Sequence, residues 1–60
     1  MIQTVIIEDE IAAHNHLKNL LENKYGNQIT IVGHETSVKN GIKLIEECKP
    51  QLVFLDIQLD

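Results

Sequence analysis

The sequence predicts an α/β fold in which three parallel strands alternate with two helices. Three short apolar runs, at residues 4–7, 29–32 and 52–55, are separated by two segments of helical periodicity. Strands that alternate with helices pair in parallel through right-handed crossovers. Acidic residues directly follow the first and third runs. Because parallel strands end along one edge of a sheet, where ligands of such folds bind, a site is expected at that edge.

The first strand and helix are expected between residues 4 and 25. The run Thr4-Val5-Ile6-Ile7 is β-branched and nearly all apolar, which is typical of a strand buried on both faces. From Glu10 to Tyr25, apolar residues recur every three or four positions, as in an amphipathic helix. They are Ala13, Leu17, Leu20 and Leu21. The acidic start suits the positive end of a helix dipole, and Gly26-Asn27 is a suitable C-terminal stop.

The second strand and helix follow the same order. Residues 29–32 read ITIV, which predicts a strand that is shorter than the first and nearer an edge of the sheet. Either Thr36 or Ser37 can cap the next helix through its hydroxyl. The face of that helix that packs on the sheet is expected to hold Val38, Ile42, Ile45 and Cys48, with Leu44 beside them.

The second helix contains a glycine and ends before a proline. Gly41 weakens a helix by about 1 kcal/mol relative to Ala, so close packing is the expected reason for it. Lys49-Pro50 ends the helix, because the residue before proline disfavours the α conformation. Residues 52–55 read LVFL and form the third strand, which runs into Asp56.

Sixty residues is short for a self-sufficient domain. A chain of this size buries only about 60% of the surface that its unfolded form exposes. Cys48 is the only cysteine, so no disulfide can form within the chain, and no Cys/His cluster suggests structural zinc. Support is therefore expected from a partner, a second copy or the remainder of a longer polypeptide.

Charge and hydropathy exclude two classes of partner. A net charge of −4, with five scattered lysines and no arginine, argues against a nucleic-acid interface on this segment. No apolar run approaches the ~20 residues of a membrane span. No basic region precedes the first strand, as it would in a signal peptide. The sequence predicts a cytoplasmic protein without membrane contact.

Glu8, Asp9 and Asp56 would be neighbours if the first and third strands pair side by side. Carboxylates gathered in a crevice repel one another, which raises their pKa values. A hard cation such as Mg²⁺ removes this conflict, because it binds through one or two carboxylates together with waters and a phosphate. An aspartate beside such a metal can be the nucleophile that becomes an aspartyl-phosphate. The alternative is that these residues are acidic only because loops are polar.

Two motifs resemble those of response-regulator receiver domains in two-component signalling. Residues 5–10 read VIIEDE, like the strand and acidic pair that open such a domain, and residues 51–59 read QLVFLDIQL, like the segment around its phosphoacceptor aspartate. The resemblance implies that residues 1–60 are the N-terminal half of a receiver domain. It implies a truncated flavodoxin-like (CheY-like) parallel sheet with strand order 2-1-3. The LDIQL motif at residues 55–59 is similar to that of receivers that carry LytTR-type DNA-binding output domains.

The resemblance also implies a role for each site residue. Asp56 would accept a phosphoryl group from a sensor histidine kinase. Asp9 would bind Mg²⁺ directly and Asp56 would also be a metal ligand, while Glu8 would act mainly through metal-bound water and Gln58 would offer its backbone carbonyl. The chain would then be a regulatory phosphoacceptor domain with Mg²⁺ as its cofactor, and not an enzyme.

Receiver domains continue through two further βα units, which supply a Ser or Thr and a Lys that bind the phosphoryl oxygens. The sequence stops at Asp60 without them. We therefore expect a piece of a receiver that self-associates as a homo-oligomer through its open third strand. DNA binding would belong to a missing output domain. The alternative function is a non-catalytic interaction module that takes no phosphate.

The remaining polar residues are expected to have ordinary roles. His14 and His16 lie two apart on the first helix and do not share a face, so both are expected in solvent. His34 is expected in a loop after the second strand, and Cys48 is expected to pack as a small hydrophobe. A haloacid-dehalogenase phosphatase is disfavoured because position 58 is Gln and not a second aspartate. A flavodoxin-type cofactor site is disfavoured because no Gly-rich or Ser/Thr-rich loop follows the first strand.

Overall fold

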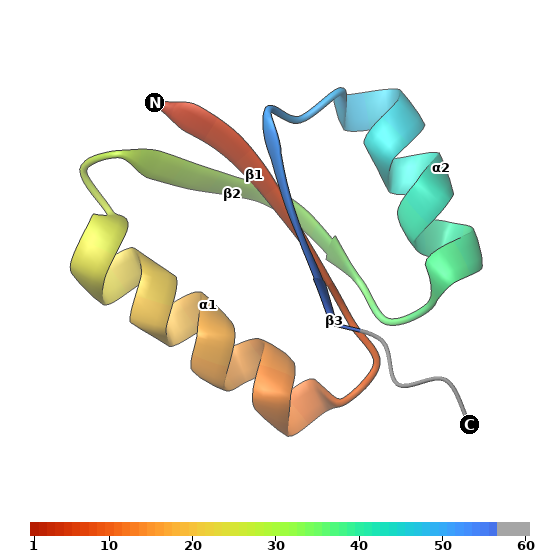
Figure 1. Ribbon diagram of the computed structural model, residues 1–60, viewed down its shortest axis with the longest axis horizontal. Coiled ribbons are helices and arrows are strands. Elements are labelled where there is room, and N and C mark those ends of the chain that lie inside the picture. The colour runs from red at the N-terminus through yellow and green to blue at the C-terminus, as the bar shows by residue number, and fades with distance from the viewer. Residues whose placement is uncertain (57–60) are drawn as a thin grey trace.

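The computed structural model describes residues 1–56, and all five predicted elements are present in the predicted order. The strands are β1 (Ile2–Glu8), β2 (Ile29–Glu35) and β3 (Leu52–Asp56), and the helices are α1 (Ile11–Tyr25) and α2 (Val38–Cys48) (Figure 1). The expectation that β2 is shorter than β1 was wrong. Backbone pairing does not require apolar side chains, so β2 continues past its apolar run.

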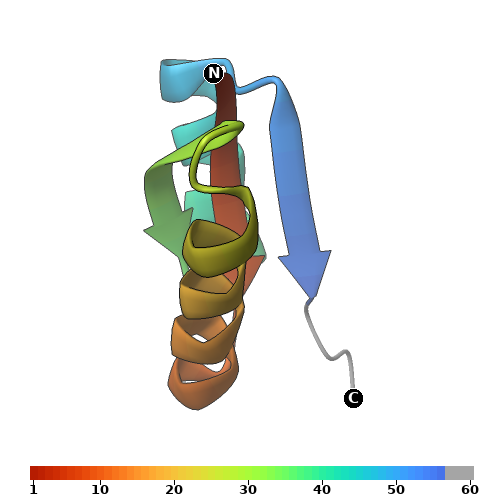
Figure 2. The same cartoon turned by 90° about the vertical axis from the view of Figure 1, so that its left-hand side faces the viewer.

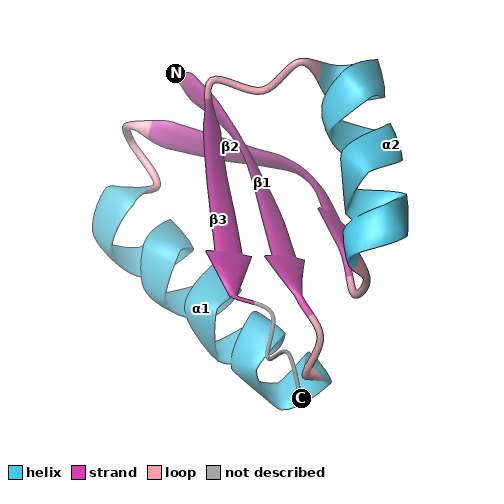
Figure 3. Ribbon diagram, turned by 45° about the vertical axis from the view of Figure 1, so that its right-hand side comes forward, coloured by secondary structure: helices cyan, strands magenta, loops and turns pink. Residues whose placement is uncertain are grey.

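The three strands form one parallel sheet in the order β2-β1-β3, which confirms the predicted order. Helix α1 covers one face of the sheet and α2 covers the other (Figures 2 and 3). Both helices pack over β1 and β2, so within residues 1–56 β3 is an edge strand with no helix above it. The central strand β1 is enclosed on both faces, and Val5, Ile6 and Ile7 are buried. No helix in this part of the chain is long and apolar enough to cross a membrane.

The buried stripe of α1 confirms the prediction for Ala13, Leu17 and Leu21. His14 and Lys18 complete the set of residues that are not exposed, and the spacing of all five places them on one face of a helix. Leu20, which was predicted on this face, is exposed. The prediction that His14 lies in solvent was wrong, because its side chain is only 5% exposed. Leu20 follows Leu17 by three positions and Leu21 follows it by four, so both fit the helical repeat. For this reason Leu20 was predicted on the packing face.

Helix α2 approaches the sheet through its glycine. Gly41 is buried, and a Cβ at this position would lie 2.5 Å from Ile7 Cδ1. The close packing expected at Gly41 is therefore confirmed. The approach turns Val38 and Ile42 away from the sheet, and both are exposed, so their predicted place on the packing face was wrong. Cys48 is half-buried, as expected for a small hydrophobe on that helix.

A β-bulge in β2 decides which faces its last residues occupy. The pairing of β2 with β1 shifts by one residue between Thr4 and Val5, and Val32 is left without a partner. Beyond the bulge, Gly33 lies beneath α2, where a Cβ would lie 2.9 Å from Leu44 Cδ1. A side chain at this position would therefore require the Leu44 side chain to shift. Because successive strand residues alternate between faces, the residue after Gly33 is directed to the α1 side.

The core beneath α1 forms around Ile6, Leu21 and Ile29. Partly buried side chains packed against it are Leu17, Ile31 and Phe54. His34 borders this core, opposite Ile6 on β1. The prediction that His34 lies in a loop was wrong, because β2 continues through it to Glu35.

Both ends of α2 are fixed by local hydrogen bonds. The Ser37 hydroxyl accepts a hydrogen bond from the Asn40 N–H at 3.2 Å. Of the two predicted candidates, Ser37 is therefore the cap. At the other end, Lys49 has a left-handed backbone with φ 48°, and its N–H donates to the Ile45 carbonyl at 2.8 Å. Pro50 follows and cannot continue the helix.

Ser37→Ala removes the cap of α2 and is expected to lower the free energy of unfolding by about 1 kcal/mol. Thr36→Ala, at the adjacent exposed position, is the matched control and is expected to change it little. Urea denaturation of the two variants measures the difference. Equal losses in both would contradict the assignment of Ser37 as the cap.

Candidate functional site

The carboxyl ends of β1 and β3 bring acidic residues together from distant parts of the chain. The two strands pair in parallel to their last residues, where Glu8 lies opposite Asp56. Neighbouring strands are separated by about 4.8 Å. Asp9 follows Glu8 in the turn before α1, and both Asp9 and Asp56 act on the Glu8 carboxyl. The ends of β1 and β3 lie side by side (Figure 3), and the predicted gathering of three carboxylates at this sheet edge is present.

Glu8 is the buried member of this group. Its side chain is 5% exposed, whereas Asp9 and Asp56 are exposed. The Glu10 N–H donates to Glu8 Oε1 at 3.1 Å, which favours the ionised form and acts to lower the pKa of Glu8. Burial, hydrogen bonding of the protonated form with Asp9 and Asp56, and the charge of Asp56 all act in the opposite direction and together prevail. The pKa of Glu8 is raised above its ordinary value, so negative charge at this edge is incompletely compensated.

The carboxylates at this edge suit a hard cation, but they do not enclose one. Carboxylate oxygens are ligands that Mg²⁺ accepts, and this ion usually keeps several of its waters. Within residues 1–56, no three His, Cys, Asp or Glu side chains are arranged to hold one metal ion together. The exposed carboxylates of Asp9 and Asp56 are the groups that a cation could reach, while Glu8 is engaged by Glu10. Gln58, the predicted carbonyl donor, lies outside the described residues.

Strand β2 contributes a further carboxylate that the apolar pattern does not reveal. Glu35 is the last residue of β2 and lies opposite Ile7, one position before Glu8. The apolar run of this strand stops three residues earlier, at Val32, so no strand end is expected at Glu35 from hydropathy. Glu35 adds negative charge to the edge, but it is not among the groups that shift the pKa of Glu8.

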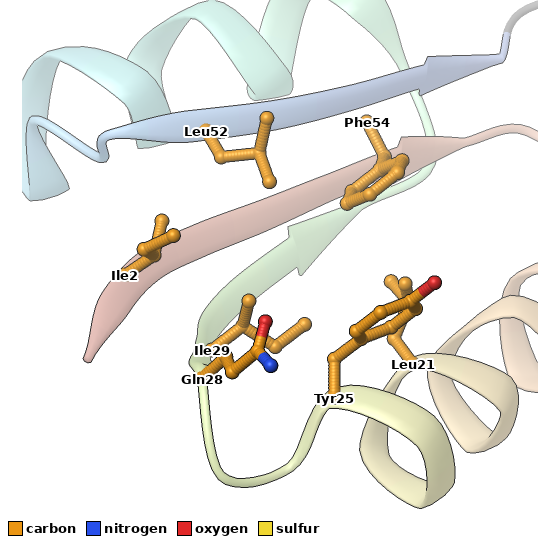
Figure 4. A pocket seen from close by; sticks show the side chains of 7 residues that line it. All are labelled: Ile2, Leu21, Tyr25, Gln28, Ile29, Leu52 and Phe54. Carbon is orange, nitrogen blue, oxygen red and sulfur yellow. The ribbon is translucent and has the colours of Figure 1, made fainter.

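A hollow of about 380 Å³ opens between α1 and β3 at the opposite end of the sheet (Figure 4). Its lining residues are Ile2, Leu21, Tyr25, Gln28, Ile29, Leu52 and Phe54. Except for the Tyr25 hydroxyl, this lining has no titratable side chain. The hollow is an apolar surface away from the carboxylates and contains no candidate nucleophile. His16 is exposed, as predicted, and does not contribute to either region.

Glu8→Gln is expected to raise the Tm at neutral pH when no divalent cation is present. The folded-state pKa of Glu8 lies above its ordinary value of 4.5, so ionised Glu8 destabilises the fold at higher pH. The wild type regains this stability as the pH falls through the folded pKa toward 4.5, and the advantage of E8Q should shrink in parallel. Glu22→Gln, at an exposed position of α1, is the control and should show no such gain. A Tm of E8Q below that of the wild type at neutral pH would contradict the repulsion inferred at this edge.

Curated proteins that resemble the chain are response regulators. The sensory transduction protein LytT of Bacillus anthracis is 36% identical over 59 residues, which are 98% of this chain and 23% of the relative. An uncharacterised response regulatory protein of Vibrio parahaemolyticus is 39% identical, over 98% of this chain and 24% of the relative. The transcriptional regulatory protein BtsR of Escherichia coli is 34% identical over the same shares. The chain spans about a quarter of the length of these relatives.

No family model matches the chain, and no solved structure matches it. The similarity to response regulators covers all but about one residue of the chain and so includes the carboxylate edge. The observed strand order agrees with the first three strands of a flavodoxin-like sheet. The chain is homologous to response regulators, and its fold is that of part of a CheY-like receiver domain.

Proposed function

We propose that this chain is the phosphoacceptor part of a two-component response regulator, in which Asp56 takes a phosphoryl group from a sensor histidine kinase. The observation that carries the proposal is the position of Asp56, exposed at the end of β3 and opposite the buried Glu8. The names of the relatives, which include a sensory transduction protein and a transcriptional regulator, support a role in signalling.

Asp56 supplies the nucleophile in this proposal. Its exposure allows the phosphorylated imidazole of a kinase to reach the carboxylate. The P–N bond of a phosphohistidine that carries a proton on its other ring nitrogen breaks while a P–O bond to an Asp56 carboxylate oxygen forms, which leaves a neutral imidazole and an aspartyl-phosphate. Pairing of β3 with β1 through Asp56 holds the backbone of the nucleophile at the sheet edge, and such positioning accelerates transfer.

Mg²⁺ would be held beside Asp56 by the carboxylate of Asp9, with Glu8 acting through metal-bound water and Gln58 through its backbone carbonyl. The raised pKa of Glu8 supports this, because a cation would offset the cost of burying the ionised carboxylate and its repulsion by Asp56. The hydrogen bond from Glu10 keeps Glu8 oriented, which suits a role in positioning water. When bound, Mg²⁺ would offset negative charge on the transferring phosphoryl group.

The rest of the reaction and its output would depend on residues beyond this segment. The relatives are about four times longer, and one is named as a transcriptional regulator. We infer that further units supply the Ser or Thr and the Lys that bind the phosphoryl oxygens, and that a LytTR-type output domain binds DNA. The segment itself would be a regulatory phosphoprotein of the cytoplasm, with its kinase as the catalyst.

The apolar surface of β3 favours a second candidate function, a non-catalytic interaction or self-association module. Leu55 is 64% exposed and Leu52 is also exposed on this edge strand. An unpaired strand edge with apolar side chains is a template for pairing with another chain. Homo-oligomer formation through β3 therefore remains a prediction beside the phosphoacceptor role.

Phosphoryl transfer to Asp56 can be tested on the native protein with Mg²⁺ and a small acyl-phosphate donor. Intact-mass measurement should detect one added phosphoryl group that hydroxylamine removes, as expected for an acyl phosphate. Asp56→Asn should abolish the adduct, because the amide is not a nucleophile toward phosphorus. Glu47→Gln, at an exposed position of α2, should leave it unchanged. A folded wild-type protein that takes no phosphoryl group would overturn the proposal and favour the interaction module instead. An adduct that persists in D56N would also overturn it.

A further inference from the structure

Two histidines from different elements meet between α1 and β2. The rings of His14 and His34 lie with their centroids 4.4 Å apart and are tilted by 39°. His14 belongs to the first turn of α1 and is buried, whereas His34 belongs to β2 and is exposed. The contact depends on the phase of α1 and on the bulge in β2, which together place both rings on the same side of the sheet.

The neighbours of His14 on its own helix do not compensate a positive charge on its ring. Lys18 lies one turn further along the half-buried stripe, and its charge acts on His14. Glu10 lies one turn before His14, and its backbone carbonyl accepts the His14 backbone N–H at 2.9 Å, but its carboxylate is not among the groups that shift the pKa of His14. No side-chain hydrogen bond joins the His14 ring to another described residue.

The strands beneath α1 provide no ion-pair partner for the histidines either. On β1, Ile6 lies opposite His34, and the one titratable residue of that strand is Glu8. The Glu8 carboxylate accepts the Glu10 N–H and does not contribute to the pKa shift of His14. On β2, Glu35 follows His34 and lies in register with Ile7, so it belongs to the α2 side of the sheet.

Burial, followed by the positive charges of His34 and Lys18, lowers the pKa of His14 below its ordinary value of 6.5. A group whose pKa is lower in the folded state than in the unfolded chain takes up its proton preferentially on unfolding. The stability contributed by neutral His14 is therefore complete above pH 6.5 and is lost as the pH falls from 6.5 through the folded value.

We propose that His14 and His34 form a pH-sensitive contact between α1 and β2, which holds the helix against the strand while both rings are neutral and loosens when a proton binds. A proton on the buried His14 ring lies close to a second imidazole and a lysine. Among the described residues, no anion is hydrogen-bonded to this ring to compensate the charge. The two rings of a neutral pair can instead stack at their observed separation.

Hydrogen bonds link the histidine contact to the carboxylate edge. The backbone N–H of His14 donates to the Glu10 carbonyl at 2.9 Å, and the backbone N–H of Glu10 donates to Glu8 Oε1 at 3.1 Å. Loosening of the first turn of α1 would therefore release the turn that holds Glu8. The proposal does not rest on phosphoryl transfer, because it concerns the packing of α1 and is tested without Mg²⁺ or a phosphoryl donor.

The test uses the native protein in buffers that contain a chelator, from about pH 8 to about pH 5, the range in which histidines titrate. Imidazole carbon–proton NMR signals give the pKa of each ring without any substitution, and the pKa of His14 should lie below its ordinary value of 6.5. In urea unfolding over the same range, the wild type should lose stability relative to H14L below pH 6.5, and the ratio of their unfolding constants should change by at most about tenfold per pH unit for one proton.

Three variants separate the contact from general effects of histidine titration. His14→Leu cannot bind the proton and should flatten the pH dependence of unfolding. His16→Gln, at an exposed position of the same helix, should leave it as in the wild type. His34→Gln removes an exposed neighbour and should move the pKa of His14 upward, which can be measured even if H14L does not fold. A His14 pKa at or above 6.5, no movement of the His14 pKa in H34Q, or equal pH slopes for H14L and H16Q would each overturn the proposal.

Discussion

Parallel pairing of β1 with β3 continues to the last residue of both strands, where it sets Glu8 opposite Asp56. The arrangement is stabilised by the core, because β1 is the central strand and Val5, Ile6 and Ile7 are buried beneath a helix on each face. The same pairing creates the electrostatic conflict at the edge, since it brings a buried carboxyl beside a second carboxylate. Fold and candidate chemistry thus depend on one register: a one-residue slip would move Asp56 away from Glu8 and reverse the faces of β3.

The elements and their order could be predicted because each depends on a strong local signal. Continuous apolar runs marked the strands, the hydroxyls of Thr36 and Ser37 marked the start of α2, and Pro50 marked its end. The carboxylate edge followed from topology alone, since parallel strands end on one side. Asp9 and Asp56 could be assigned to that edge without knowledge of any side-chain contact, whereas Gln58 lies outside the described residues.

The features that the sequence did not reveal depend on tertiary packing. The phase of α1 was ambiguous because Leu20 and Leu21 both fit the repeat, and only contact with the sheet decides between them. The bulge at Val32 has no hydropathy signature, yet it directs the next residues of β2 to their faces. Together these two features produce the contact between His14 and His34. The first turn of α1 consequently lies between a carboxylate group and a histidine pair, joined through the backbone of Glu10.

The most direct test of the central claim is to locate a bound cation on the native protein. Mn²⁺ accepts the same oxygen ligands as Mg²⁺ and broadens nearby NMR signals through its unpaired electrons. Substoichiometric Mn²⁺ should broaden the amide signals of Glu8, Asp9 and Asp56 first, and excess Mg²⁺ should restore them. Broadening centred on the exposed Glu46 and Glu47 of α2, or spread evenly over the acidic surface, would contradict a cation site at the shared end of β1 and β3.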